Sequence, residues 1–226
     1  MPTPAASSSA ARHLPPAKAA EIDAVLESLV VRWHEVAPAA DVPARDGRPG
    51  EPVPGLDDRI GELHRFNFLL WHEEDIARSP EVTDARIAAV KRAIDRYNQA
   101  RNDAIERVDD WLIEELGRRG IAAEAGAPAA TETPGAAIDR LSILELRRFH
   151  MREQIDRADA TIEHRQKAAA RMAVLDVQRD HLVEAVDRLL GEIFAGQRPL
   201  RVFRQMKMYN DPTMNPYLYR AGKAAA

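Results

Sequence analysis

Polar side chains recur at helical spacing along the stretch 83–116, and they are the residues of this sequence best placed for chemistry. Lys91, Asp95, Asn98 and Asn102 follow one another every three or four positions, which puts them on one face of a helix. Asparagine is a poor helix former, so two of them inside a helix indicate a use beyond local stability. A file of amides and carboxylates predicts either a ligand site or a buried hydrogen-bond network.

The preceding stretch 56–78 carries a second polar file. With Asn67 as origin, Trp71, Glu74 and Arg78 lie within about 60° of it on a helical wheel. The middle of this stretch is apolar nearly all round, and such helices are typically buried on every side. Because only the residues SPEV connect the two stretches, we expect an antiparallel hairpin whose polar files face each other.

A metal site is one chemistry that these residues could perform. The run His-Glu-Glu-Asp at 72–75, with Asp95, Asn98 and Asn102, offers ligands for Mg²⁺ or Mn²⁺. All-α nucleoside-triphosphate pyrophosphohydrolases hold such ions with carboxylates on paired helices, but here Asn98 stands where a second carboxylate is needed. The histidines at His64, His72, His150, His164 and His181 share no ligand spacing. We therefore expect no bound metal or other cofactor, with Mg²⁺ or Mn²⁺ as the alternative.

Recognition of a sugar phosphate is the hypothesis that uses most of these residues. Arg and Lys supply cations for a phosphate, while Asn, Asp and Tyr side chains bind hydroxyl groups. The candidate ligand-binding residues are Asn67, Trp71, Glu74, Arg78, Lys91, Asp95, Asn98, Asn102, Asp139, Tyr209, Asn210 and Asp211. A structural network that fixes the register of the helices is the alternative for the amides and carboxylates. Ser142 has no His and acid at recognisable spacing, and there is no P-loop, so no catalytic residue is assigned.

The elements that must position these residues are helices. The stretch 83–116 contains no Gly or Pro, begins with Thr83 as a credible N-cap and runs to Gly117 and Gly120. Its apolar residues recur every three or four positions, from Ile87 to Leu116, and form the stripe that faces the core.

A further helical pattern begins at Thr133, which can cap a helix, with Pro134 in its first turn. The pattern continues to Gly196, which is too long for one helix in a compact domain. We expect a turn between 158 and 162, with Asp159 or Thr161 as the cap of the next helix.

The order of these elements predicts an all-α fold, an antiparallel bundle of five or six helices in a single domain. The bundle is expected over 56–219, between a disordered N-terminus at 1–14 and a disordered C-terminus at 220–226. An amphipathic first helix at 15–37 precedes a Pro- and Gly-rich linker at 38–55. Because this linker has few apolar groups, we expect the first helix to be a loosely attached arm.

Composition narrows the class of protein. The chain has 226 residues and a formal net charge of −4, which argues against a nucleic-acid-coating surface. It contains no cysteine, so disulfides and a thiol nucleophile are excluded. No stretch is apolar enough for a signal peptide or a membrane span, and we expect a cytoplasmic protein with no nucleic-acid partner.

Four segments of the chain resemble a known family. They are HRFNFLLWHEEDIAR, KRAIDRYNQARNDAIERVD, TPGAAIDRLSILELRRFH and RQMKMYNDPTMNPYLY. In this order they are similar to a bacterial family catalogued as domain of unknown function 4254, over roughly Leu56 to Tyr219. The segment PGAAIDRLSILELR also resembles a motif of a second uncharacterised family.

The resemblance implies a setting and leaves the activity open. Members of the first family have no established activity, and their genes often accompany those for glycosyltransferases of lipopolysaccharide and other surface glycans. The favoured hypothesis is therefore an accessory protein or enzyme of surface-glycan synthesis that binds a sugar-phosphate-type ligand. The alternatives are a non-catalytic adaptor that docks on a glycosyltransferase through the first helix and linker, and a metal-dependent nucleotide pyrophosphohydrolase.

Overall fold

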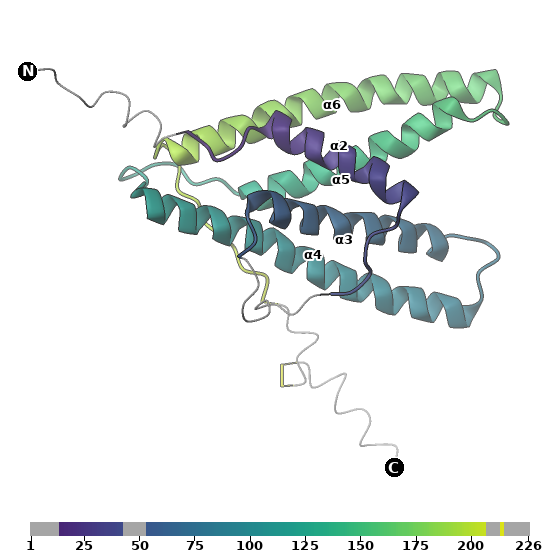
Figure 1. Cartoon of the computed structure of the whole chain (residues 1–226), viewed down its shortest axis with the longest axis horizontal. Helices are drawn as coiled ribbons and strands as arrows, with labels where there is room; N and C mark the ends of the chain where they lie inside the picture. Colours follow the sequence, from purple (N-terminus) through teal and green to yellow (C-terminus); the bar gives the residue numbers. More distant parts are fainter. Residues whose placement is uncertain (1–13, 43–52, 207–212, 215–226) are drawn as a thin grey trace, which may run out of the picture.

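Five α-helices make up the regular structure of the computed structural model, which describes residues 14–42, 53–206 and 213–214 (Figure 1). They are α2 (Ala19–Glu35), α3 (Leu56–Ala77), α4 (Asp84–Arg119), α5 (Pro134–Asp156) and α6 (Ile162–Phe194). The described residues contain no strand, so the prediction of an all-α bundle in a single domain is confirmed. None of these five helices is long and apolar enough to cross a membrane.

Threonine caps begin three of the helices. The side-chain oxygens of Thr83, Thr133 and Thr161 each accept a hydrogen bond from the backbone N–H three residues later. These caps confirm the predicted starts of α4 and α5, and Thr161 marks the predicted break between α5 and α6. Helix α4 passes through Gly117 and ends at Arg119, and its C-cap is Gly120, whose φ of 69° suits glycine.

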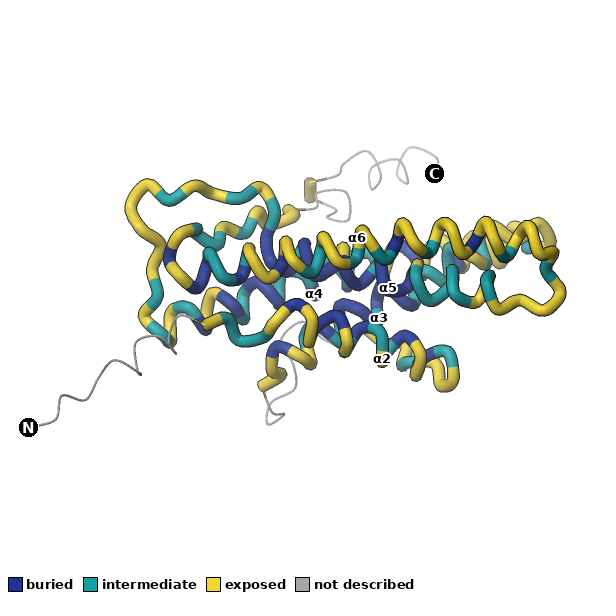
Figure 2. The backbone as a smooth tube through the Cα atoms, turned by 90° about the horizontal axis from the view of Figure 1, so that it is seen from above, coloured by how far each residue is buried: buried dark blue, intermediate teal, exposed yellow. Residues whose placement is uncertain are grey.

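Two antiparallel hairpins, α3–α4 and α5–α6, pack together around one core (Figures 1 and 2). Phe66, Leu112, Leu141 and Leu190 are among the side chains that are fully enclosed in it. Burying one such side chain stabilises the fold by about 1.5–3 kcal/mol. Ile87, at the start of the predicted core stripe of α4, is instead exposed.

Helix α2 lies across α3, α5 and α6 as part of the core (Figure 1). Its residues Ile22, Leu26 and Val30 are 2% exposed or less. The expectation of a loosely attached arm is therefore wrong. The composition of the linker indicates only how α2 is connected to the rest of the chain. The apolar stripe of α2 itself determines whether this helix packs on the bundle.

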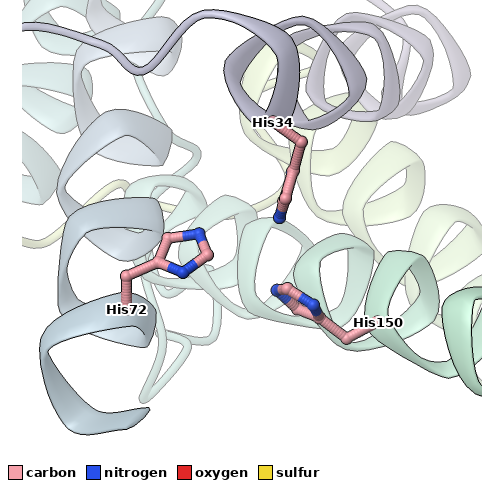
Figure 3. Close-up of side chains that lie close together, drawn as sticks. All are labelled: His34, His72 and His150. Carbon is pink, nitrogen blue, oxygen red and sulfur yellow. The ribbon is translucent and has the colours of Figure 1, made fainter. Parts of the chain in front are cut away.

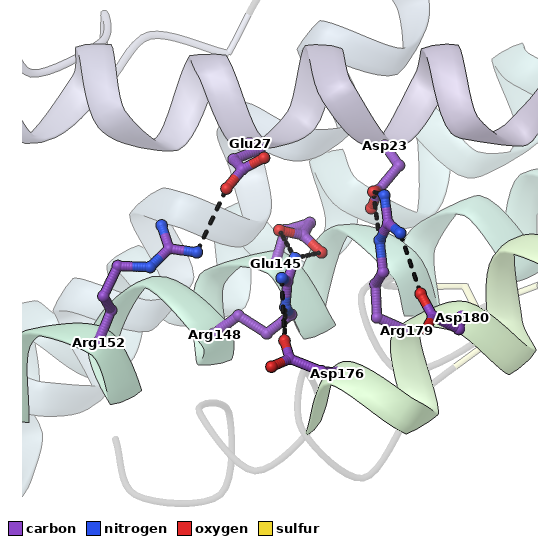
Figure 4. A network of polar contacts seen from close by, with 8 residues as sticks. All are labelled: Asp23, Glu27, Glu145, Arg148, Arg152, Asp176, Arg179 and Asp180. Carbon is purple, nitrogen blue, oxygen red and sulfur yellow. Dashed lines mark hydrogen bonds and ion pairs between the residues drawn. The ribbon is translucent and has the colours of Figure 1, made fainter. Parts of the chain in front are cut away.

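Charged side chains also hold α2 in place (Figure 4). Asp23 of α2 is 1% exposed, and its Oδ2 accepts from Arg179 Nε of α6 at 2.6 Å. Beside it, Glu145 of α5 accepts from Arg148 Nη1 at 2.8 Å, and Arg148 also reaches Asp176 of α6. Burial raises the pKa of Glu145 from its ordinary value of 4.5 to about 7, against the opposing effect of Arg148, and the Asp23 carboxylate adds to the rise.

The chain after α6 returns along α4, and residues 199–206 are called the strap. Leu200 packs against the core. Arg204 Nη1 donates to Glu106 Oε2 at 2.9 Å and Arg204 also pairs with Asp110, while the backbone N–H of Gln205 donates to Glu106 Oε1 at 3.2 Å. The strap thus packs on α4 of the bundle.

Candidate functional site

The two predicted polar files divide into an exposed part and a buried part. Glu74 pairs with Arg78 at 2.8 Å, and Lys91 pairs with Asp95 at 2.6 Å, each four residues apart on one helix. Their side chains are 42–68% exposed. Exposed pairs of this kind contribute about 0.3–0.5 kcal/mol. These four residues therefore form surface ion pairs, and the expectation that the two polar files face each other is wrong for them.

The buried part joins three helices. Asn67 of α3 is 4% exposed, and its Nδ2 donates to Asp139 Oδ1 at 2.9 Å and to Ser142 Oγ at 2.8 Å, both on α5. Arg101 of α4 completes the connection, because its Nε donates to Asp139 Oδ1 at 2.8 Å and its Nη2 to Asp139 Oδ2. Two predicted residues, Asn67 and Asp139, thus meet in a network whose hydrogen bonds are largely satisfied within the protein.

A serine and a histidine also meet in this network. The Ser142 hydroxyl accepts from Asn67, so it retains its own hydrogen to donate to His64 Nδ1, 2.7 Å away. Burial lowers the pKa of His64 to about 3, so the ring is neutral. Both Ser142 and His64 are 0% exposed and no substrate reaches them. The pair therefore ties α3 to α5 and is no nucleophilic dyad.

A cavity of about 290 Å³ lies between α4, the start of α5 and the strap, and we call it the α4–α5 pocket. Asn102 of α4 lines it, and its side-chain amide has no hydrogen-bond partner within the described part of the chain. The hydroxyls of Thr131 and Thr133, the Arg140 guanidinium and the Phe203 ring share the lining. Asn98, one turn away and half-buried, lies outside it.

Helix α5 approaches α4 closely beside this pocket. Gly135 donates its backbone N–H to Asp109 Oδ1 at 2.7 Å. A Cβ at Gly135 would stand 2.5 Å from the Ile105 carbonyl oxygen and 2.9 Å from Asp109 Oδ1, so glycine is required here. Burial raises the pKa of Asp109 from its ordinary value of 3.8 to about 6, opposed by hydrogen bonds from Thr133 and Gly135.

Three predicted residues, Tyr209, Asn210 and Asp211, lie outside the described residues. The twelfth, Trp71, lies on α3 away from the α4–α5 pocket, and its ring stacks on His150 with centroids 4.7 Å apart.

Three histidines lie close together at the C-terminal end of α2 (Figure 3). His34 of α2, His72 of α3 and His150 of α5 each offer a ring nitrogen, and these atoms lie within 4.8 Å of one another. Among the residues that the structure describes, they are the one group of three or more His, Asp or Glu side chains that meets closely enough to hold a metal ion. We call this group the histidine triad.

The Nε2 atoms of the histidine triad are all buried without a hydrogen-bond partner. A buried unpaired polar group costs about 1–3 kcal/mol, so three together need an explanation. Burial, followed by the nearby His34 and His150, lowers the pKa of His72. Sequence reasoning missed the triad, because it weighed His72 and His150 by spacing and left His34 aside.

Residues 57–202, more than half of the chain, match one family model, which is described as "Protein of unknown function (DUF4254)". The match runs from the first turn of α3 into the strap and leaves α2 outside. Comparisons with curated proteins and with solved structures gave no match. The chain therefore belongs to the family of unknown function DUF4254.

Proposed function

We propose that this protein is an accessory protein or enzyme of bacterial surface-glycan synthesis that binds a sugar-phosphate-type ligand in the α4–α5 pocket. The role in glycan synthesis comes from the resemblance to a family whose genes often lie beside those for glycosyltransferases. The ligand class comes from the side chains of the pocket. The two parts are separate claims and are tested separately.

The observation that carries the ligand is the set of groups around Asn102. Its amide has no hydrogen-bond partner among the described residues, and it lines a cavity together with the Thr131 hydroxyl. The Thr133 hydroxyl also lines the cavity but is already bound to Asp109 and to the Ala136 N–H. Amides and hydroxyls both donate and accept hydrogen bonds, as recognition of sugar hydroxyls requires. The exposed ring of Phe203 offers an apolar face for a sugar ring.

Charge at the pocket allows one anionic group. Arg140 pairs with Glu132 and its side chain is 67% exposed, so the guanidinium is within reach of a ligand phosphate at the rim. The other carboxylates of the lining are engaged: Glu106 binds Arg204, and Asp109 accepts from Gly135. Arg140 is the one cationic side chain among the described residues that line the pocket, so a ligand phosphate would bind beside it.

Size restricts the ligand further. Sites for drug-sized molecules occupy about 300–1,000 Å³. The α4–α5 pocket, at about 290 Å³, lies just below this range. It suits a single sugar with one phosphate better than a sugar nucleotide.

The structure offers the two alternatives no comparable support. An adaptor was expected to use the first helix and its linker. The apolar face of α2 is buried against α3, α5 and α6, and residues 43–52 of the linker lie outside the described residues. A pyrophosphohydrolase was expected to use Glu74 and Asp95, but both carboxylates are in exposed ion pairs.

A thermal-shift screen tests the ligand. Hexose phosphates, free hexoses, inorganic phosphate and sugar nucleotides are added singly to the full chain. A ligand at 100 times its Kd stabilises the folded state by about 2.7 kcal/mol, which raises the melting midpoint. We expect a hexose phosphate to do so, and Asn102→Ala to weaken its binding at least tenfold, with Asp95→Asn as the matched surface control. A screen without any shift, or an equal shift in Asn102→Ala, would contradict the proposal.

A further inference from the structure

Hydrogen bonds orient two rings of the histidine triad so that Nε2 is free to bind a ligand. His34 Nδ1 lies 2.8 Å from the Val30 carbonyl oxygen, which can only accept, so Nδ1 carries the hydrogen. His150 Nδ1 lies 2.7 Å from Glu153 Oε2 and donates to that carboxylate in the same way. A neutral imidazole with hydrogen on Nδ1 has its lone pair on Nε2, the buried and unpartnered atom of each ring.

We propose that His34, His72 and His150 together bind one divalent transition-metal ion where α2, α3 and α5 meet. The three Nε2 atoms would supply the protein ligands. The site is separate from the α4–α5 pocket, and the proposal is independent of the proposed function.

Aromatic neighbours hold the rings in place. His34 stacks on Phe149 with centroids 4.0 Å apart, and His150 stacks on Trp71 with an interplanar angle of 10°. His72 packs against Phe68 in an edge-to-face arrangement with centroids 4.4 Å apart. Rings fixed by packing lose little freedom when they bind an ion, so the triad is largely arranged before binding.

The donor set selects the class of metal. Imidazole nitrogens suit Zn²⁺, Cu²⁺, Ni²⁺ and Fe²⁺, whereas Mg²⁺ prefers oxygen ligands. Nitrogens bound to zinc at about 2.0–2.1 Å in a tetrahedron stand roughly 3.3 Å apart. The ring nitrogens of the triad lie within 4.8 Å of one another, so binding an ion requires them to approach by up to about 1.5 Å.

Hydrogen-bond partners behind the rings match those of natural metal sites. Metal-bound histidines usually donate their second ring N–H to a carboxylate or a backbone carbonyl. Glu153 and the Val30 carbonyl have these positions behind His150 and His34. Glu153 is therefore a positioning residue, which acts on the ion through His150.

The histidine side chains are partly exposed, although their Nε2 atoms are enclosed. All three side chains are half-buried. Three histidines with one position open to water form the ligand set of catalytic zinc sites. In this proposal, water or an anion completes the coordination of an ion bound by the three histidines.

Metal titration of the tag-free full chain tests the site. After treatment with a chelator, the protein is dialysed against Zn²⁺ or Co²⁺ and the bound metal is measured by elemental analysis. We expect one equivalent, and at least a hundredfold weaker binding in each of His34→Gln, His72→Gln and His150→Gln. The exposed His181 of α6 provides the matched control, because His181→Gln should bind within twofold of the wild type.

Glu153→Gln separates a metal site from a merely structural cluster. It keeps an acceptor for His150 but removes the negative charge, so we expect one equivalent of metal at roughly 10–100-fold lower affinity. If the wild type binds less than about a fifth of an equivalent, or if His72→Gln and His181→Gln bind alike, the proposal is overturned.

A readout that leaves the triad intact covers the case in which a ligand variant misfolds. In the double variant Trp33→Phe and Trp111→Phe, Trp71 is the remaining tryptophan and stacks on His150. Co²⁺ bound at the triad should quench its fluorescence and saturate at one equivalent, while Mg²⁺ should leave it unchanged. Unchanged fluorescence at saturating Co²⁺ would also overturn the proposal.

Discussion

Replacing Asn67 with alanine removes the amide that ties α3 to α5. Two hydrogen bonds are lost, one to the Asp139 carboxylate and one to the Ser142 hydroxyl, and both acceptors stay buried. A hydrogen bond to a charged group contributes about 1.5–3 kcal/mol and one to a neutral group about 0.5–1.5 kcal/mol. Asp139 keeps Arg101 and Ser142 keeps His64, so the loss is limited to these two bonds. We expect Asn67→Ala to lower the free energy of unfolding by about 2–4 kcal/mol.

Urea denaturation followed by circular dichroism at 222 nm measures this free energy directly. Asp95→Ala is the matched control, because its exposed pair with Lys91 predicts a change within about 0.5 kcal/mol. A double-mutant cycle of Asn67→Ala with Ser142→Ala should give an interaction energy of roughly 0.5–1.5 kcal/mol. If Asn67→Ala costs less than about 1 kcal/mol and resembles the Asp95 variant, the buried network is not what joins these helices.

Three further changes follow from the packing and the charges. Gly135→Ala should destabilise the protein by about 2 kcal/mol or more in urea, because its Cβ has no room, whereas Gly117→Ala, with open space around it, should stabilise α4 by up to about 1 kcal/mol. Deleting residues 1–53 should abolish cooperative thermal unfolding, because it removes the buried face of α2. Glu145 and Asp109 have raised pKa values of about 7 and 6, so the native state binds more protons than the unfolded state. Their contribution to stability is full below about pH 4 and is lost as pH rises through 6 to 7.

Each of these changes has a result that would contradict it. Equal effects of Gly135→Ala and Gly117→Ala on the free energy of unfolding would contradict the packing argument. A sharp melting transition at an unchanged midpoint in the truncated protein would contradict the role of α2 in the core. For the titration, urea curves from pH 5 to 8 in a chelator should show stability falling with pH, by on the order of 2–3 kcal/mol for Glu145. A slope that stays the same in Glu145→Gln would contradict its assigned role.

Helix boundaries were predictable because their signals are local. Thr83, Thr133 and Thr161 stand directly before apolar patterns, and each caps a helix through its own side chain. The antiparallel α3–α4 hairpin followed from its short connection in the same way. Docking of α2 was not predictable from the linker, because it depends on surfaces of α3, α5 and α6 that meet only in the folded chain.

The polar files show where helical wheels stop being informative. Asn67 and Glu74 share a direction on one wheel, but α5 covers Asn67 and leaves Glu74 to pair with Arg78 of its own helix. A wheel gives the direction of a side chain and no account of where the neighbouring helix lies. Asn102 and Asp139 were therefore predicted as one site, although Asn102 lines a pocket and Asp139 belongs to the buried network.

The histidine triad had no local signature at all. Its members stand on three helices separated by long stretches of sequence, so no ligand spacing connects them. Only the packing of α2 beside α3 and α5 brings their rings together. A loosely attached α2 would not have placed His34 beside His72 and His150.

The surface glycan of a host bacterium tests the proposed function most directly. A strain lacking the gene is complemented with the wild type, with the double variant Asn102→Ala and Arg140→Gln, or with Asp95→Asn. Gel profiles of extracted lipopolysaccharide should show an altered glycan in the deletion strain. The wild type and Asp95→Asn should restore it, whereas the pocket variant should not, at equal protein levels. An unchanged glycan in the deletion strain would contradict the glycan role, and full restoration by the pocket variant would contradict the ligand site.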